Sequence, residues 1–324
     1  MIGLFDTGVA SSNLGDEIIM DAVRKHLRAL FPTAFFVHVP THDIIGEASL
    51  NIVRHSDYTF VGGTNLLSSN MDKYNQWKIG KHERKYLRGA VLLGVGWWQY
   101  QSAPNNYTAK LLRSVLHPEL LHSVRDGYTA QKLAEAGITN VINTSCVTMW
   151  DLTPGHCDLI PPAKAEKVVT TLTDYKKDPA ADRAFLELLG RSYSKVFLWL
   201  QGTGDHAYAS SLSLPPNVEF VVPSVDAFDD LLRSPLSLDY VGTRLHAGIR
   251  ALSHKRRALI LAVDNRALEM GRDFDLPVVD RTDIAGIRRH IGEARKTSLN
   301  VPFDKIAEWK RQFVTVDAKG EMAR

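Results

Sequence analysis

The sequence has few cysteines, no long apolar run and no strong excess of charge of one sign. Only Cys146 and Cys157 occur among its 324 residues, so a disulfide framework is excluded and a reducing compartment is favoured. The longest apolar stretch, residues 89–98, is about half of the ~20 residues that a membrane-spanning helix needs. Residues 1–17 lack the basic start, apolar centre and cleavage site of a secretion signal. We therefore expect a cytoplasmic protein, and contact with the inner face of the cell membrane stays open.

The charge of the chain is mild and dispersed. Its formal net charge is +3 and its sequence pI is near 8.7, which does not indicate a nucleic-acid surface. Basic residues do cluster, first in the run 254–257 and then in a second group that consists of Arg288, Arg289, Arg295, Lys296, Lys305, Lys310 and Arg311. Such clusters suit phosphate or an anionic membrane surface, but solvated helix faces explain them more simply. The sequence indicates no oligomeric state.

Several motifs of nucleotide, metal and hydrolase chemistry are missing. No G-x-G-x-x-G fingerprint opens a helix, and no G-x-x-x-x-G-K-[ST] phosphate loop occurs. His156, Cys157 and Cys146 lack the paired spacing of a zinc site, and neither H-E-x-x-H nor a G-x-S-x-G elbow is present. We expect neither a metal nor another bound cofactor.

What the chain does contain is a regular alternation of short β-rich runs and amphipathic helical segments. The first run, "IGLFD", precedes a helix expected over residues 17–30, and further runs continue to "NVINTSC". Residues 151–165 interrupt the alternation with a proline-rich linker, after which it restarts at "KVVTTLT". This pattern predicts parallel sheets with helices on both faces, in two domains of residues 1–160 and 161–324. Ligands are expected at the carboxyl ends of the strands and in a cleft between the domains.

The sharpest local signal is "VGTRLHAGIRAL", residues 241–252, where a strand gives way to a helix. Arg244 and His246 fall at the helix start, where unpaired N–H groups and the helix dipole favour an anion. A guanidinium adds bidentate recognition of phosphate or carboxylate, and an imidazole adds proton transfer near neutral pH. A histidine that only caps the helix or packs in the core is the alternative, and the residues alone leave both open.

A polar turn, "SSNLGDEII" at residues 11–19, joins the first strand to the first helix. Asp16 or Glu17 could accept a proton from the hydroxyl of an acceptor molecule. Helix capping by Asn13 or Asp16 explains the same residues more simply, because such side chains are preferred at helix starts.

Glycines follow two further strands, in "VGGTN" at residues 61–65 and "GVGWW" at residues 94–98. At such positions the backbone can approach a ligand closely. Trp97, Trp98 and Tyr100 could form a platform for the face of a sugar, although core or rim positions are more usual for aromatic side chains.

Two more strand ends carry charged residues. "SVRDGYTAQKLAEAGI" places Arg125 beside Asp126, where the arginine either binds a ligand or pairs with its neighbour. "AVDNRALEMG" places Asp264, Arg266 and Glu269 at the junction that follows the 241–252 segment. These three either hold a ligand or brace the neighbouring arginine, and bracing is the simpler interpretation.

Taken in order, "NLGDEII", "VGG", "GVG", "SVRD…L…GI", "TSC…WDL", "GTRLHAGIRAL" and "DNRALEMG" resemble the polysaccharide pyruvyl transferase family, from about residue 11 to residue 280. The resemblance implies an α/β fold of two Rossmann-like parallel-sheet domains facing a cleft, as in GT-B glycosyltransferases. It implies phosphoenolpyruvate as donor, bound by the second domain. On the first domain it implies an acceptor hydroxyl, from a sugar of an exopolysaccharide or surface glycan or its lipid-linked precursor. The R-x-H pair of the family falls on Arg244 and His246, and its S-x-R-D arginine on Arg125.

The chain departs from the family pattern in its first half. Gly62-Gly63-Thr64 occupies the position of three glycines, and "GVG" continues into Trp97-Trp98 where the family often has G-P. Arg244, His246 and Asp16 are the expected catalytic residues. Arg244, together with Arg125, binds the carboxylate and phosphate of the donor. His246 gives a proton to C3 or to the leaving phosphate, and Asp16 or Glu17 is the base. The expected substrate-binding residues are Asn13, Gly15, Glu17, Gly62, Gly63, Arg125, Thr243, Leu245, Asp264, Arg266 and Glu269. A GT-B glycosyltransferase that uses a nucleotide sugar and a non-catalytic glycan-binding relative stay open as alternatives.

Overall fold

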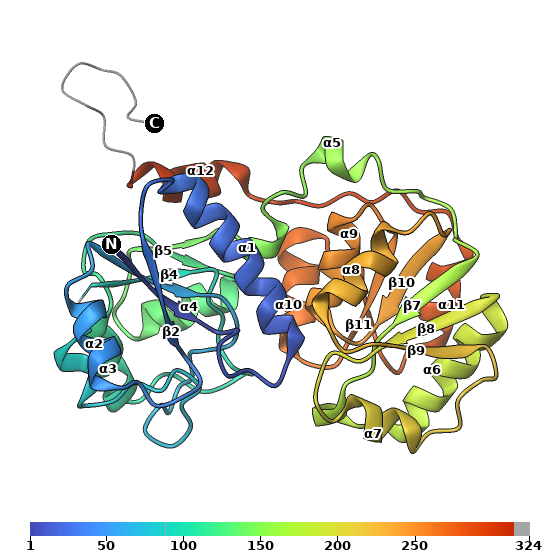
Figure 1. The fold of residues 1–324 in the computed structure, drawn as a ribbon, viewed down its shortest axis with the longest axis horizontal. Helices are drawn as coiled ribbons and strands as arrows, with labels where there is room; N and C mark the ends of the chain where they lie inside the picture. The colour runs from blue at the N-terminus through green and yellow to red at the C-terminus, as the bar shows by residue number, and fades with distance from the viewer. Residues whose placement is uncertain (88, 314–324) are drawn as a thin grey trace. The chain divides into compact units, whose positions relative to one another are not determined.

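The computed structural model describes residues 1–87 and 89–313 as two compact units, each built on its own parallel sheet (Figure 1). Unit 1 contains residues 1–11, residues 19–150 and the described residues from 301 on. Unit 2 contains residues 12–18 and 151–300. These units differ from the predicted ranges 1–160 and 161–324, because residues 12–18 and 151–160 make their contacts within unit 2, whereas residues 301–313 pack in unit 1.

Unit 1 is built on a four-stranded parallel sheet of order β2-β1-β3-β4, accompanied by a parallel pair, β5 and β6. The strands are β1 (Ile2–Asp6), β2 (Phe36–Pro40), β3 (Tyr58–Gly62), β4 (Ala90–Leu93), β5 (His122–Val124) and β6 (Val141–Asn143). The helices are α1 (Leu14–Leu30, which starts in unit 2), α2 (Glu47–Arg54), α3 (Asn106–Val115), α4 (Gly127–Glu135), α12 (Phe303–Arg311) and the 3-10 turns η1 (Glu83–Lys85) and η2 (Val147–Met149). Strands β1 and β4 are buried along their whole length, and β3 is buried except at Tyr58, because both faces of such a sheet are covered.

Aromatic side chains hold the C-terminal helix of unit 1 in place. Figure 1 shows α12 lying across the end of α1, and the rings of Phe31 and Phe313 lie 5.8 Å apart there. Trp309 contacts Phe60 at 6.0 Å between ring centroids. This packing gives residues 301–313 their place in unit 1.

Unit 2 contains a six-stranded parallel sheet of order β12-β11-β10-β7-β8-β9. Its strands are β7 (Lys167–Thr170), β8 (Lys195–Trp199), β9 (Val218–Val221), β10 (Leu238–Gly242), β11 (Ala258–Ala262) and β12 (Val278–Asp280). Its helices are α5 (Pro154–Cys157), η3 (Asp174–Lys176), α6 (Pro179–Ser192), α7 (Asp205–Ser210), α8 (Val225–Arg233), α9 (Leu245–Ser253), α10 (Asn265–Phe274) and α11 (Ile284–Gly292). The chain runs outward from β7 to β9 and then returns to β10 on the other side of β7. This doubly wound order places the topological switch point between β7 and β10.

Helices cover both faces of the unit 2 sheet. Figure 1 shows α8, α9 and α10 on one side of the strands and α6 and α11 on the other. The predicted linker belongs to this unit and contains α5, and Leu252 in α9 accepts a hydrogen bond at 2.8 Å from Nε2 of His156. No helix within residues 1–87 and 89–313 is both long and apolar enough to cross a membrane.

Candidate active site

Three segments of unit 2 meet at the carboxyl edge of its sheet, next to the switch point. They follow β7, β8 and β10 and contain residues 171–176, 200–205 and 243–246. Backbone N–H of Thr243 donates to the carbonyl of Thr171 at 3.1 Å, and N–H of Arg244 donates to the Thr171 hydroxyl at 3.2 Å. The crevice beside such a switch point is where open α/β sheets bind their ligands.

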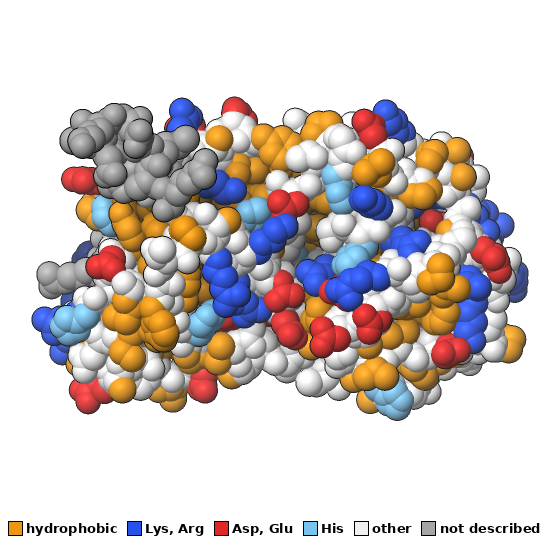
Figure 2. Space-filling model, turned by 45° about the horizontal axis from the view of Figure 1, so that its top comes forward, with side chains coloured by type: hydrophobic (Ala, Val, Ile, Leu, Met, Phe, Trp, Pro, Cys, Tyr) orange, Lys and Arg blue, Asp and Glu red, His pale blue; other side chains and the backbone are white. Residues whose placement is uncertain are grey.

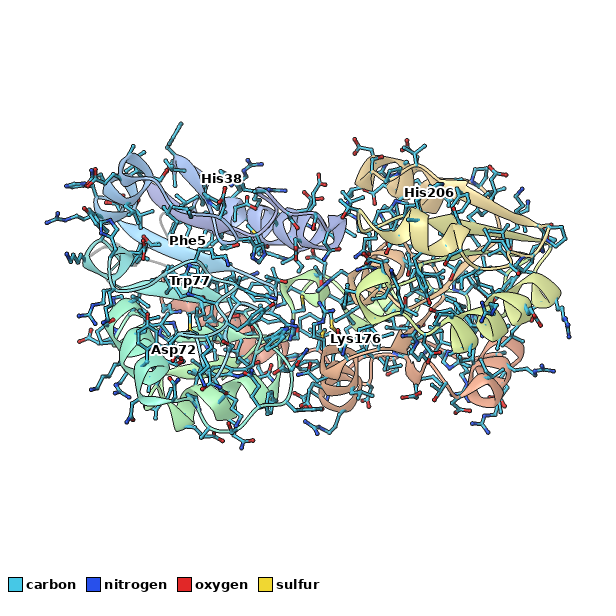
Figure 3. The ribbon with its side chains drawn as sticks, turned by 90° about the horizontal axis from the view of Figure 1, so that it is seen from below. Phe5, His38, Asp72, Trp77, Lys176 and His206 are labelled. Carbon is cyan, nitrogen blue, oxygen red and sulfur yellow. The ribbon has the colours of Figure 1, made fainter. Side chains whose placement is uncertain are left out.

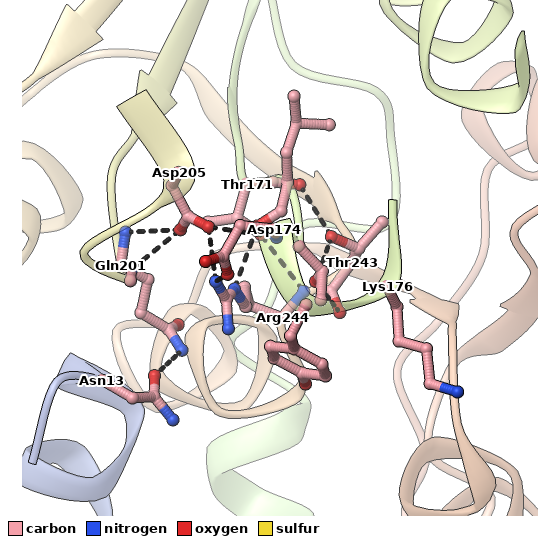
Figure 4. Close-up of polar contacts among 12 residues, drawn as sticks. Asn13, Thr171, Asp174, Lys176, Gln201, Asp205, Thr243 and Arg244 are labelled. Carbon is pink, nitrogen blue, oxygen red and sulfur yellow. Dashed lines mark hydrogen bonds and ion pairs between the residues drawn. The ribbon is translucent and has the colours of Figure 1, made fainter. Parts of the chain in front are cut away.

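The side chain of Arg244 joins all three segments (Figure 4). Its Nε donates to the carbonyl of Leu172 at 2.9 Å, and its Nη2 donates to Asp174 at 2.9 Å and to Asp205 at 2.5 Å. The ring of Tyr175 lies over the guanidinium, with its centroid 5.1 Å from Cζ. Arg244 is therefore fixed in a buried position, with 3% of its surface exposed.

The charges around Arg244 do not balance, because two carboxylates face one guanidinium. Asp205 also accepts from N–H of Gln201 at 3.1 Å and from N–H of Gly202 at 2.8 Å, so it organises the segment after β8 as well. Burial raises the pKa of Asp205, although Arg244 opposes that rise. Within the described chain, Nη1 of Arg244 has no hydrogen-bond partner. An anion that approaches Arg244 therefore finds one unused N–H direction and two acidic neighbours.

The strand-to-helix junction predicted over residues 241–252 is observed. Strand β10 ends at Gly242, and Arg244 precedes the first residue of α9 with extended backbone angles. His246 is the second residue of α9 and is 4% exposed, while its neighbours Thr243 and Leu245 are buried as well. Arg244 and His246 are therefore both buried at this strand-to-helix junction.

Residues 12–18 bring the start of α1 into unit 2. The Asn13 side chain accepts from N–H of Gly15 at 3.1 Å, so it caps the helix, which begins at Leu14 rather than at the predicted residue 17. The same oxygen accepts from Nε2 of Gln201 at 2.8 Å, and a Cβ at Gly15 would lie 2.7 Å from that nitrogen. Asn13 and Gly15 therefore contact the segment after β8 at the candidate site.

Two other features of this contact bear on ligand binding. Oε1 of Gln201 is buried and has no hydrogen-bond partner within the described residues, so it remains available as an acceptor. Asp16 is buried, with 6% of its surface exposed, whereas Glu17 is exposed.

The charged residues after β11 are also organised. Asp264 accepts from N–H of Arg266 at 3.0 Å at the start of α10, and the Arg266 guanidinium reaches the Tyr175 hydroxyl at 2.5 Å. Burial works against the charge of Arg266, but the carboxylate of Asp264 keeps its pKa above the usual value. Glu269 pairs with Arg272 one turn further along α10. Arg266 thus reaches the candidate site through Tyr175.

Three of the predicted residues lie in unit 1. Arg125 is 1% exposed, and it donates to Asp126 at 3.1 Å and to Asn65 at 2.7 Å. A Cβ at Gly62 would lie 2.8 Å from Sδ of Met20, and one at Gly63 would overlap Ile19 of α1. In unit 1, therefore, the two glycines permit close packing of α1, and the arginine is held by buried polar partners.

The other predicted residues all belong to unit 2: Asn13, Gly15, Asp16, Glu17, Thr243, Arg244, Leu245, His246, Asp264, Arg266 and Glu269. Sequence reasoning missed Asp174, Tyr175, Gln201 and Asp205. A signal for them existed, since each follows a strand within six residues, as the polar segments "TDYK" and "QGTGD" show.

The basic run 254–257 includes two arginines with structural partners. Arg256 donates to the carbonyls of Leu232 at 2.7 Å and Leu236 at 2.8 Å, and Arg257 donates to the carbonyl of Ile291 at 3.1 Å. Basic and acidic side chains are interspersed on the face drawn in Figure 2. In the part of the chain that the structure describes, no group of three or more His, Cys, Asp or Glu residues is arranged to hold a metal ion.

The chain is similar to known proteins in its sequence family and in its fold. A family model described as polysaccharide pyruvyl transferase matches residues 13–265. No curated protein sequence matches significantly. Among solved structures, S. aureus MnaA with UDP is 12% identical with a TM-score of 0.50, and the match covers 91% of each chain. UDP-GlcNAc 2-epimerase from Neisseria meningitidis, bound to UDP-GlcNAc, is 13% identical with a TM-score of 0.43, over 96% of this chain and 92% of the other. The two parallel sheets and the MnaA likeness confirm the predicted α/β, GT-B-like fold class.

Proposed function

Because the chain belongs to the polysaccharide pyruvyl transferase family, we propose that it transfers a pyruvyl group from phosphoenolpyruvate to hydroxyls of a sugar. The acceptor sugar would belong to an exopolysaccharide or another surface glycan, or to its lipid-linked precursor. The observation that carries the proposal is the position of Arg244 and His246, at a helix start beside the topological switch point of the unit 2 sheet.

The donor is an enol phosphate with a carboxylate, so its site must offset two anionic groups. In the proposal, Nη1 of Arg244 and the first N–H groups of α9 contact one of them. Lys176 is exposed two residues after Asp174 and supplies a further cation (Figure 3). Asp174 and Asp205 hold Arg244 in place, and their negative charge limits how tightly the donor ground state binds.

The proposed reaction balances without an added cofactor. A sugar hydroxyl oxygen bonds to C2 of phosphoenolpyruvate while C3 gains a proton and becomes a methyl group. A second hydroxyl then bonds to C2, and the bond from C2 to the phosphate oxygen breaks, which completes the ketal. The two hydroxyl protons end on C3 and on phosphate. His246 is the proposed proton donor, and Asp16 or Glu17 is the proposed base for the first hydroxyl.

The experiment follows phosphate release from phosphoenolpyruvate in the presence of sugar acceptors. His246→Ala is expected to lower the rate by ~100-fold or more, the scale of a lost proton-transfer group. Arg250→Ala is the matched control, because Arg250 lies on the same helix but its guanidinium binds Asp229 at 2.5 Å, away from the switch point. A His246→Ala enzyme that retains the wild-type rate would contradict the proposed role.

Ligand-induced stabilisation gives an independent reading of the donor. Phosphoenolpyruvate at 100 times its dissociation constant is expected to stabilise the fold by about 2.7 kcal/mol. Stabilisation by nucleotide sugars, with none by phosphoenolpyruvate, would instead favour a glycosyltransferase.

A further inference from the structure

Two loops of unit 1 carry stacked aromatic side chains that face solvent. The loops contain residues 63–79 and 94–105 and follow the carboxyl ends of β3 and β4. Tyr74 and Trp98 stack with 4.1 Å between ring centroids and 29° between planes, and Tyr74 is 42% exposed. Tyr100 is 57% exposed and meets Tyr128 edge to face at 5.2 Å. Trp97, in contrast, is fully buried and belongs to the core.

Partly buried hydrogen bonds fix the two loops. The indole N–H of Trp97 donates to the Gln101 side chain at 3.1 Å, and N–H of Ser69 donates to the same oxygen at 2.8 Å. N–H of Gln101 in turn donates to the Tyr128 hydroxyl at 2.7 Å. Gln99, between the half-buried Trp98 and the exposed Tyr100, has a φ of 57°, a left-handed conformation that non-glycine residues adopt only when their surroundings enforce it. The aromatic faces are therefore held in place before any ligand arrives.

One amide group contacts the Tyr74 hydroxyl, and other amide groups belong to the same two loops. Nε2 of Gln76 donates to the Tyr74 hydroxyl at 2.9 Å, and Nδ2 of Asn105 donates to Asp72 at 2.7 Å. Oδ1 of Asn75, the residue after Tyr74, is buried and has no partner among the described residues. The core beneath contains Trp77, whose ring lies beside Phe5 with 5.5 Å between centroids (Figure 3).

We propose that Tyr74, Trp98 and Tyr100 form a platform that binds a neutral sugar ring of the acceptor glycan. A pyranose has an apolar C–H face that suits an aromatic ring, and hydroxyl edges that suit amide donors and acceptors. The platform lies beyond the carboxyl ends of parallel strands, where open α/β sheets bind ligands. This inference rests on the proposed function in one respect, that the acceptor is a sugar, and it requires nothing of the phosphoenolpyruvate donor.

The platform is tested by titrating the full chain with a panel of neutral p-nitrophenyl hexosides and with dextran. Tyr74→Ala and Tyr100→Ala are each expected to weaken sugar binding about tenfold, as loss of an aromatic anchor does at other binding sites. Phe35→Ala is the matched control, since Phe35 is 74% exposed in the same unit but outside both loops, and it should bind as the wild type does. In a turnover assay the platform variants should raise the KM for the sugar without changing the affinity for phosphoenolpyruvate.

The outcomes separate this inference from the proposed function. Sugar binding that depends on Tyr74 and Tyr100, without phosphate release from any donor, would support the sugar platform and contradict the proposed transferase activity. Phosphate release with an unchanged KM for the sugar in both variants would support the transferase activity and contradict the platform. If the wild-type chain binds none of these sugars, or if Tyr74→Ala changes only the sedimentation of the protein, the surface is not a sugar platform.

Discussion

Removal of Arg244 should affect stability and activity separately, because this side chain neutralises a buried carboxylate. The side chains of Arg244 and Asp205 are 3% and 2% exposed and lie 2.5 Å apart. Deleting one partner of such a buried pair costs about 3–5 kcal/mol, since the other charge is left without compensation. Asp205 keeps three backbone N–H donors, which places the expected loss for Arg244→Ala near the lower end of that range. For a unit of this size the melting temperature should fall by roughly 10 °C.

A second substitution tells the two roles apart. In Arg244→Ala/Asp205→Asn no buried carboxylate remains opposite the missing guanidinium, so most of the lost stability should return. Phosphate release from phosphoenolpyruvate should stay at least ~100-fold below wild type, because the proposed anion-binding group is still absent. Both quantities can be measured on the same preparations, by calorimetric melting and by a phosphate assay.

The pH dependence of the single variant has a defined sign. Burial raises the folded-state pKa of Asp205 above 3.8 in the wild type, and loss of Arg244 should raise it further. A folded state that holds more protons than the unfolded state loses stability as pH rises. Arg244→Ala should therefore be closest to wild-type stability near pH 5 and furthest from it near pH 8. An equal deficit at both pH values, or full activity in the double variant, would refute this reasoning.

Three other predictions follow from named contacts. Asp174→Asn removes one negative charge beside Arg244. At ~6 Å from an anionic group of the donor, and with an effective dielectric constant of ~40, the repulsion from that charge is worth about 1.4 kcal/mol. Calorimetry should therefore find phosphoenolpyruvate bound about tenfold more tightly, and weaker binding would contradict the charge argument. Burial lowers the pKa of His122 from 6.5 to about 4, so the fold favours its neutral form and unit 1 should lose stability as pH falls from 6.5 towards 4. In melting curves recorded at several pH values, His122→Gln should reduce this loss. An unchanged dependence of stability on pH would exclude His122 as its source. In Gly63→Ala the added Cβ would overlap Ile19, and the backbone φ of +47° is unfavourable for alanine. Urea unfolding should show unit 1 destabilised by about 1–3 kcal/mol. Gly46→Ala is the control and should change stability little, because a Cβ at Gly46 has no neighbour within 4 Å.

The sequence alone determined the class of fold and the position of the main junction. Apolar runs of strand length that alternate with amphipathic segments are local signals, and they predicted parallel sheets with helices on both faces. The motif at residues 241–252 likewise predicted a strand that ends at Gly242 and a helix that begins near Arg244, because glycine and helix-start preferences act over a few residues.

Only the tertiary structure decided which side chains surround that junction. Arg244 is hydrogen-bonded to Asp205 and Asp174, which are 39 and 70 residues away in the sequence. Asn13 is hydrogen-bonded to Gln201, which is 188 residues away. Such pairs arise because parallel strands far apart in sequence end at one edge of a sheet, and no local pattern specifies which loops meet there. The same reason explains why Arg266 reaches the site through Tyr175, and why residues 301–313 return to unit 1.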